Sequence, residues 1–125
     1  MKPSSLPKSQ IVSGRLAVSA LLEKGKGGTS GCLRYKWVVT GGGESRIMVS
    51  VPKKSFRRAV KRNLLKRRMR EAYRLQKDLI GPGLDILFVY VSRGIIPFAD
   101  IYADMTAALT AIASCHFEPA EKSHE

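Results

Sequence analysis

Basic and amide side chains at helical spacing are the residues of this sequence best suited to chemistry. Six of them are separated by three, four or seven residues, so one face of a helix would carry them all. They are Asn63, Lys66, Arg67, Arg70, Arg74 and Lys77, and Arg62 flanks the row. Arg can bind phosphate oxygens with two parallel donors, and Asn can both donate and accept toward a sugar or base edge. The pattern indicates a rigid helix that grips a folded nucleic acid.

The charge of the whole protein is concentrated around this row. Residues 53–74 contain eleven Lys or Arg against one acid, Glu71, a net charge of +10, while the whole chain carries +12. Successive turns of the helix would carry like charges that repel one another, so helix stability does not explain them. A polyanion does, because each cation near a phosphate releases condensed counterions. Arg68 projects to a different side and is interpreted as a charge for solubility.

Groups that could catalyse a reaction by themselves do not occur in suitable patterns. The ten acids form no short-spaced metal pair, and His116 and His124 lie in or beside the C-terminal tail. The segment 25–31, GKGGTSG, lacks the Lys-Ser/Thr end of a phosphate-binding loop. Cys32 and Cys115 are too few for a disulfide framework or a metal cluster, and both are interpreted as small buried or half-buried residues. No catalytic residue and no metal site are predicted in this chain.

Length and composition predict one globular domain over residues 1–125 that acts in the cytoplasm. Its 44% apolar content is ordinary for a folded protein. The longest apolar run, 84–91, contains Asp85 and is far shorter than the ~20 residues of a membrane span. The N-terminus has no apolar segment typical of a secretory signal. Residues 1–10 and 116–125 are expected to be flexible tails, and the high charge favours a monomer in isolation.

Apolar spacing and turn residues predict the elements that must position the basic row. They are helix 15–24, strands 32–40 and 46–51, a basic helix from Ser55 to about Leu79, strand 84–91 and a last helix starting near Pro97. Ser13 is the expected cap of the first helix, and 25–31 is read as a flexible loop. The two central strands are expected to pair as a hairpin through residues 41–44, and the pattern leaves room for an extra strand near this hairpin.

The fold class that follows is α+β, with three helices packed on a small, mostly antiparallel sheet of about four strands. The nearly continuous apolar run 84–91 is typical of a strand in the middle of a sheet. On the basic helix, the side opposite the row carries an expected core stripe. Its members are Leu65, Met69, Ala72, Gln76 and Leu79.

Two aromatic residues leave two interpretations open. Tyr35 and Trp37 share one face of the strand 32–40, where they could stack on unpaired bases or could belong to the core. The basic helix could equally enter a DNA major groove. The predicted sheet favours RNA, because it supplies a second surface beyond a groove-reading helix.

The order of residues in 50–74 resembles the signature of the bacterial ribonuclease P protein component. The letters read SVPKKSFRRAVKRNLLKRRMREAYR. The matching features are the strand end at Val51, the step Lys53-Lys54, and the Arg62-Asn63 pair with its later cations. The resemblance extends over roughly residues 13–112. This chain has Leu64 where the family usually has Arg, and aliphatic residues where the family often has Phe in the first helix.

The resemblance implies a role beside a catalytic RNA that removes the 5′ leader of precursor tRNA with Mg²⁺. It implies that the protein binds that RNA and also the leader, in a cleft between the sheet and the first helix. The residues implied for the catalytic RNA are Lys53, Lys54, Arg57, Arg58, Lys61, Arg62, Asn63, Lys66, Arg67, Arg70 and Arg74. Those implied for the leader are Val18, Leu22, Tyr35, Trp37 and Ser50.

The resemblance also implies a left-handed crossover between the strands before and after the basic helix, where physics alone would favour a right-handed one. The alternative functions are a non-catalytic RNA-binding module, such as a ribosomal protein or an RNA chaperone, and more remotely a DNA-binding regulator.

Overall fold

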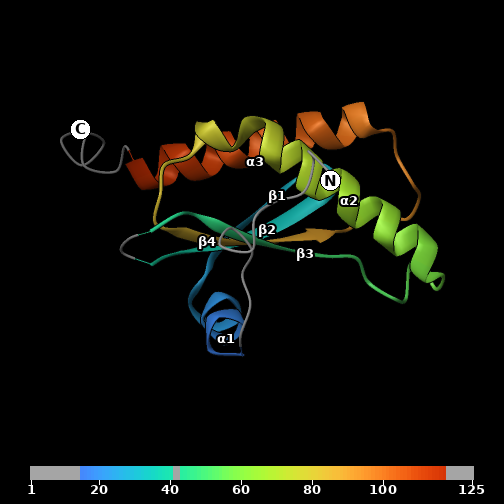
Figure 1. Cartoon of the computed structure of the whole chain (residues 1–125), viewed down its shortest axis with the longest axis horizontal. Coiled ribbons are helices and arrows are strands. Elements are labelled where there is room, and N and C mark those ends of the chain that lie inside the picture. Colours follow the sequence, from blue (N-terminus) through green and yellow to red (C-terminus); the bar gives the residue numbers. More distant parts are fainter. Residues whose placement is uncertain (1–14, 41–42, 118–125) are drawn as a thin grey trace, which may run out of the picture.

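The computed structural model describes residues 15–40 and 43–117, and within them three α-helices and four strands (Figure 1). The elements are α1 (Arg15–Lys24), β1 (Lys26–Ser30), β2 (Leu33–Val39), β3 (Arg46–Ser50), α2 (Ala59–Gln76), the short 3-10 turn η2 (Lys77–Leu79), β4 (Leu84–Tyr90) and α3 (Phe98–Phe117). The predicted α+β class with three helices and four strands is confirmed.

The four strands form one mixed sheet in the order β1-β2-β4-β3. β1 with β2 and β2 with β4 are antiparallel, while β3 and β4 run parallel. β4 lies between β2 and β3, and six of its seven residues are buried. This confirms the central position predicted for the apolar run 84–91, since a strand covered on both faces has no polar side to show.

The hairpin expected between 32–40 and 46–51 is wrong. β4 separates β2 from β3, and the adjacent antiparallel pair in sequence is β1 with β2, turning at Gly31. The expectation failed because sequence neighbours were assumed to pair, whereas the more apolar β4 takes the buried central place. The parallel β3 and β4 are joined through α2, as a crossover requires. The left-handedness of this crossover remains an implication of the resemblance.

The glycine-rich segment expected as a flexible loop is instead the edge strand β1. Backbone hydrogen bonds to β2 form it, and these do not depend on apolar side chains. The glycines have a steric role, because a Cβ on Gly28 would lie 2.5 Å from Tyr35 Oη. A sequence scan for β-branched residues therefore cannot find this strand.

The helices lie on both sides of the sheet (Figure 1). α2 and α3 cover one side, and the main core fills the space between them and the sheet. We call this side the core face. α1 packs alone on the opposite side, where Leu21 meets Leu87 in a smaller cluster. We call this side the α1 face; its strand residues are Arg34, Lys36, Val38, Arg46, Met48, Ser50, Asp85, Leu87 and Val89.

α2 begins later than predicted. Its N-cap is Arg58. Ser55 lies in the preceding turn, where its backbone amide donates to the carbonyl of Pro52. The turn precedes the helix because it buries Phe56. The centroid of the Phe56 ring lies 5.7 Å from that of Tyr90. We call residues 52–58 the basic turn.

The core stripe of α2 is largely as predicted. Leu65, Met69, Ala72 and Gln76 are buried, with Tyr73 beside them. Leu79 is wrong as a core residue, being 43% exposed, because the helix ends at Gln76 and the chain then buries Ile80.

α3 extends two residues past the start of the expected C-terminal tail, to Phe117. Residues 1–10, the cap residue Ser13, positions 41–42 and residues 118–125 lie outside the described residues.

Candidate nucleic-acid interface

Five of the six residues of the predicted row lie on the side of α2 opposite its buried stripe, whereas the sixth, Lys77, lies beyond the end of α2 in η2. Asn63 and Arg67 are exposed, and Lys66, Arg70 and Arg74 are half-buried. The buried stripe of Leu65, Met69 and Ala72 holds the opposite side of the helix on the core. A helix anchored in this way presents its cations on a backbone that is already ordered before binding. We call these five residues the basic row.

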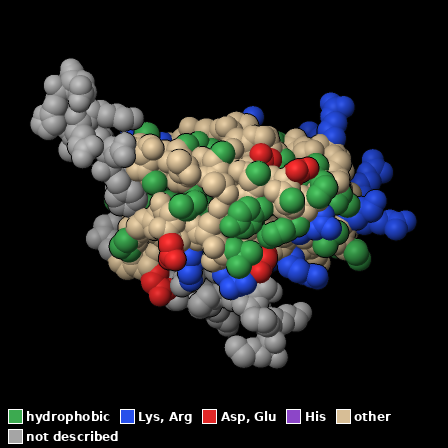
Figure 2. Space-filling view, turned by 90° about the horizontal axis from the view of Figure 1, so that it is seen from above, with side chains coloured by type: hydrophobic (Ala, Val, Ile, Leu, Met, Phe, Trp, Pro, Cys, Tyr) green, Lys and Arg blue, Asp and Glu red, His purple; other side chains and the backbone are tan. Residues whose placement is uncertain are grey.

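A basic pocket of about 430 Å³ opens where α2 begins. Its lining residues are Ser55, Phe56, Arg57, Arg58, Lys61, Arg93, Gly94 and Ile95. Four cations thus converge on one hollow, next to a helix N-terminus whose dipole also favours an anion. Figure 2 shows Lys and Arg side chains gathered at this end of the molecule. Arg93 was missed from the sequence, because it follows β4 and reaches the pocket only through the fold.

Lys53 and Lys54 are exposed on the basic turn, just before this pocket. Arg62, which the resemblance assigns to the RNA contact, is turned toward its own chain. Its Nη1 donates to the carbonyl oxygens of Phe56 and Arg57, each at 2.8 Å. Arg62 therefore fixes the shape of the turn that carries the neighbouring cations.

Two other arginines of α2 have partners inside the chain. Arg74 donates two hydrogen bonds to Glu71, the shorter at 2.7 Å, and these bonds lower the pKa of the Glu71 carboxyl. Arg68, interpreted above as a solubility charge, donates to the carbonyl of Ile96 at 2.8 Å and so ties α2 to the segment before α3.

The residues implied for the leader divide between the two sides of the sheet. Val18 of α1 and Ser50 of β3 lie on the α1 face, and Leu22 on α1 is 52% exposed. Tyr35 and Trp37 lie on the core face, only 9% and 5% exposed. Of the two interpretations left open for these rings, the structure supports the core. The alternation of a strand sends them away from α1, so they cannot share a surface with Val18 and Ser50.

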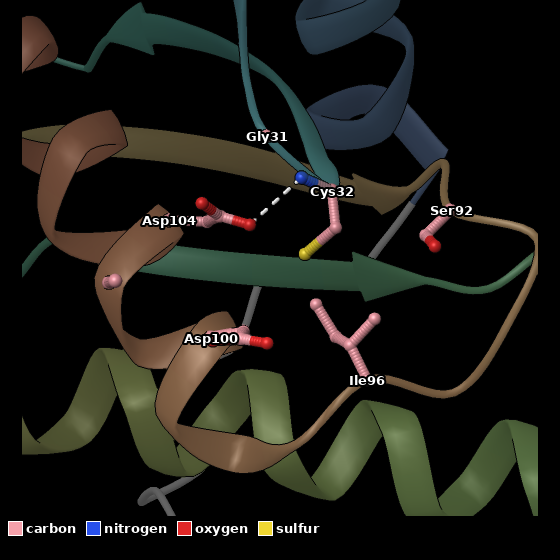
Figure 3. A pocket seen from close by; sticks show the side chains of 7 residues that line it. Gly31, Cys32, Ser92, Ile96, Asp100 and Asp104 are labelled. Carbon is pink, nitrogen blue, oxygen red and sulfur yellow. Dashed lines mark hydrogen bonds between the residues drawn. The ribbon is translucent and has the colours of Figure 1, made fainter.

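A second pocket, of about 460 Å³, has acidic walls (Figure 3). Asp100 and Asp104 of α3 line it together with Cys32. The Asp104 carboxylate accepts the backbone N–H of Cys32 at 2.9 Å and so holds the β1–β2 turn on α3. Burial, with the nearby Asp104, raises the pKa of the Cys32 thiol to about 12. Cys32 is buried as predicted, whereas Cys115 is exposed and its predicted burial is wrong.

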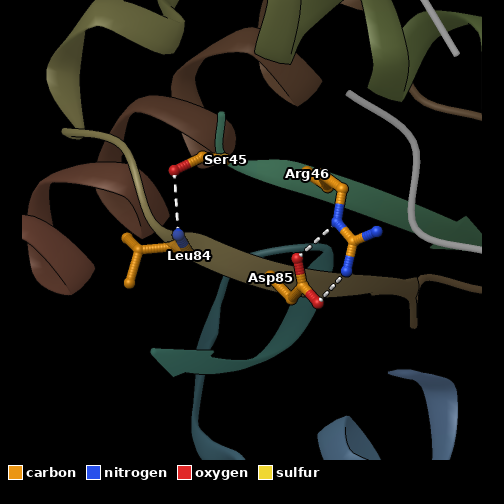
Figure 4. A network of polar contacts seen from close by, with 4 residues as sticks. All are labelled: Ser45, Arg46, Leu84 and Asp85. Atoms are coloured by element: carbon orange, nitrogen blue, oxygen red, sulfur yellow. Dashed lines mark hydrogen bonds and ion pairs between the residues drawn. The ribbon is translucent and has the colours of Figure 1, made fainter. Parts of the chain in front are cut away.

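An ion pair closes the far end of the sheet (Figure 4). Arg46 of β3 binds Asp85 of β4 through two hydrogen bonds, at 2.9 and 2.7 Å, and this contact raises the pKa of the guanidinium. Ser45 donates to the carbonyl of Gly81 and accepts the N–H of Leu84, which fixes the start of β4 beside β3. Arg46 and Asp85 therefore stabilise the pairing of β3 with β4.

No cluster of three or more His, Cys, Asp or Glu within residues 15–40 and 43–117 is arranged to hold a metal ion. Among the helices of the same residues, none has the length and apolar character needed to span a bilayer.

Curated relatives share the sequence over part of their length. The Ribonuclease P protein component of Porphyromonas gingivalis is 45% identical over 76 residues, which cover 55% of this chain and 56% of that protein. The protein of the same name from Chlorobaculum tepidum is 36% identical over 89 residues, covering 66% of this chain and 58% of the relative. The chain thus spans somewhat more than half the length of these curated relatives.

Solved structures share the fold. An RNase P protein from Thermotoga maritima gives a TM-score of 0.69 at 23% identity, over 75% of this chain and 89% of that one. The RNase P protein of Staphylococcus aureus gives 0.72 at 20% identity, over 84% and 96%. The family model described as Ribonuclease P matches residues 6–113. Because that match covers most of the sequence, the chain belongs to the Ribonuclease P family.

Proposed function

We propose that this protein is the protein subunit of ribonuclease P and assists the Mg²⁺-dependent removal of the 5′ leader from precursor tRNA. The single observation that carries the proposal is the basic row on α2, presented on a helix whose other side is locked in the core. The name of the curated relatives, Ribonuclease P protein component, supports the same function.

In this proposal the catalytic RNA binds the basic row, the basic turn and the basic pocket. Arg67 and Asn63 are exposed at the centre of the row, and Lys53, Lys54 and Arg93 extend the charge around the start of α2. The cations of the row, the turn and the pocket lie on different elements. Such an arrangement suits the backbone of a folded RNA, whose phosphates point in several directions. Arg62 takes part by shaping the turn.

The leader of precursor tRNA is proposed to bind the α1 face. Among the described residues, α1 packs mainly on β2 and β4, and Ser50 and Met48 of the edge strand β3 border the surface beside Val18. Both residues are half-buried and reach solvent.

Catalysis is proposed to lie in the RNA, as the resemblance to the ribonuclease P protein component implies. Mg²⁺ would be held by the RNA, and no step through it is assigned to this chain. The protein would act as a monomer in the cytoplasm, where precursor tRNA is its substrate.

Reconstitution tests this function. The full chain is mixed with a bacterial ribonuclease P RNA at low Mg²⁺, and cleavage of a precursor tRNA is followed. Restored cleavage at the mature 5′ end is expected. Binding of the RNA without any gain in cleavage would instead favour an RNA chaperone or a ribosomal protein, and equal binding of duplex DNA at moderate salt would favour a DNA-binding regulator.

Variants then locate the RNA contact. Replacing Arg67 and Arg70 with Ala should weaken binding of the catalytic RNA. It should also reduce the salt slope, which is the slope of log affinity against log salt concentration, by up to about 0.9 per lost phosphate contact. Lys26→Gln is the charge control, because Lys26 belongs to β1 and lies over the Trp37 ring at 5.6 Å. Unchanged RNA binding by the double variant at several salt concentrations would overturn the assignment to α2.

A further inference from the structure

Three cations of the strands project from the α1 face, and two of them have partners in the chain. Lys36 donates to the carbonyl of Leu22 at 3.0 Å, which holds the end of α1 over the sheet. Arg46 is bound to Asp85. The third, Arg34, is exposed, and no side-chain hydrogen bond or ion pair to it exists within the described residues. Within the described part of the chain, its charge is therefore available to a ligand.

The register places Arg34 in line with a residue of the proposed leader site. Across the sheet, Thr29, Arg34, Val89 and Ser50 are consecutive partners. Arg34 and Ser50 thus flank Val89 on the same face, two strand spacings or about 10 Å apart. Val89 packs in the α1 cluster, so this row crosses the floor of the surface beside α1.

The end of the sheet at which Arg34 lies is the basic end. β2 begins beside Arg34, β3 ends at Ser50 and continues into the basic turn, and β4 leads to the loop that carries Arg93. The amide of Val91 donates to the carbonyl of Cys32 at 2.8 Å, which ties these segments together. The acids near this end, Asp100 and Asp104, belong to α3 on the core side. On the strands of the α1 face the carboxylate is Asp85, which is bound to Arg46 at the opposite end of the sheet. A chain of phosphates could therefore pass from the basic turn to Arg34 without meeting a carboxylate of the strands.

Among the residues whose side chains the structure describes, this surface has no aromatic ring on which a base could stack. Within the described residues, the sheet and α2 direct their aromatic side chains into the main core, and Phe98 and Tyr102 of α3 pack against that core from its own side. The side chains that border the surface are aliphatic or polar, such as Val18 and Met48. Stacking on aromatic rings is the usual means of holding single-stranded bases, and without it the phosphates must supply the binding energy.

We propose that Arg34 binds a phosphate of single-stranded RNA on the α1 face, and that this face recognises the strand by its charge rather than by its bases. The proposal rests on the proposed function, in which that strand is the leader of precursor tRNA. Arg34 would thus bind RNA at a place separate from both the basic row on α2 and the basic turn.

The test uses the full chain reconstituted with ribonuclease P RNA, and compares affinity for precursor tRNA with affinity for mature tRNA. Arg34→Ala should weaken precursor binding about three- to ten-fold, the range of one charge-assisted hydrogen bond at an exposed site. Mature tRNA and the catalytic RNA should bind as before. Arg34→Lys should recover part of the loss, and Lys26→Gln should lose nothing.

Chemical changes in the leader identify the contact. A neutral methylphosphonate at the contacted position should weaken binding of the unmodified protein but cost Arg34→Ala nothing further. Abasic leader nucleotides should change the affinity by less than about twofold, because stacking contributes little here.

The outcomes distinguish a failure of the role of Arg34 from a failure of the proposed leader site. If the unmodified protein restores cleavage and prefers precursor tRNA, but Arg34→Ala binds it equally well, the role of Arg34 is refuted alone. A larger loss from abasic nucleotides than from neutral linkages refutes recognition by charge. If the unmodified protein shows no preference for precursor over mature tRNA, the leader site and this inference both fail.

Discussion

The guanidinium of Arg62 is held against the carbonyl oxygen of Phe56, which lies 2.8 Å from Nη1. The same nitrogen donates to the next carbonyl, that of Arg57. Phe56 is buried, so this contact joins the start of α2 to the part of the basic turn that is anchored in the core. An arginine that the family resemblance assigns to RNA is thus committed to its own backbone.

Arg62→Ala is expected to reduce the free energy of unfolding by about 1–2 kcal/mol, because two carbonyls lose a charged donor. RNA affinity should fall as the turn loosens, yet the salt slope should stay unchanged. Arg67→Ala should do the opposite, leaving urea unfolding unaltered and reducing the slope. If Arg62→Ala lost salt dependence and kept its stability, Arg62 would be a direct phosphate contact.

The pairing of Arg74 with Glu71 predicts unequal roles for the two last cations of the basic row. Arg70→Ala should weaken RNA binding more than Arg74→Ala, because Arg74 must first leave a carboxylate. Glu71→Gln should free Arg74 and strengthen binding slightly, by about two- to three-fold at low salt. Titration of the RNA complex at several salt concentrations measures all three. Equal losses from Arg70→Ala and Arg74→Ala would contradict the prediction.

The local features of this fold and the central place of the apolar strand could be predicted from the sequence, whereas the order in which the strands pair could not. The stripe of Leu65, Met69 and Ala72 follows from helical spacing alone, and the burial of 84–91 follows from its composition. β1 was missed because pairing with β2 forms it without apolar side chains. The position of β4 between β2 and β3 depends on contacts between residues more than thirty positions apart.

The candidate site shows the same division. The exposure of Asn63 and Arg67 was predictable from the helix, since the opposite face had to be buried. Arg93 joins the basic pocket only because β4 ends beside the start of α2. Arg62 has the right residue type and spacing for RNA, and only its distances to two carbonyls distinguish a positioning role from a contact.

Gly31 and Gly43 form a matched pair for testing the β1–β2 turn. Both have positive φ, +58° and +77°, so Ala at either site should cost about 1 kcal/mol of backbone strain. A Cβ at Gly31 would also collide with the Asp104 carboxylate, whereas Gly43 has open space around it. Gly31→Ala should therefore lose about 3 kcal/mol, including the bond to the Cys32 amide, and Gly43→Ala only about 1. Urea unfolding of both variants makes the comparison, which equal losses would contradict.

Burial of Cys32 and Tyr73 predicts that the protein loses stability in alkali. The pKa of each rises to about 12, from ordinary values of 9.0 for the thiol and 10.0 for the phenol. Between those values and 12 the unfolded chain has released the proton while the folded chain still holds it. The free energy of unfolding should therefore fall as pH rises above about 9, by up to about 1.4 kcal/mol per pH unit for each group.

Cys32→Ala isolates the contribution of the thiol. In this variant the decline from Cys32 is removed, so stability should hold to about pH 10 before the phenol begins to lower it. Cys115→Ala, at an exposed position, should follow the parent curve throughout. Urea midpoints at pH 7, 9, 10 and 11 under reducing conditions measure the slopes. Identical slopes for Cys32→Ala and the parent between pH 9 and 10 would show that the folded thiol ionises normally and that neither its burial nor Asp104 keeps it protonated.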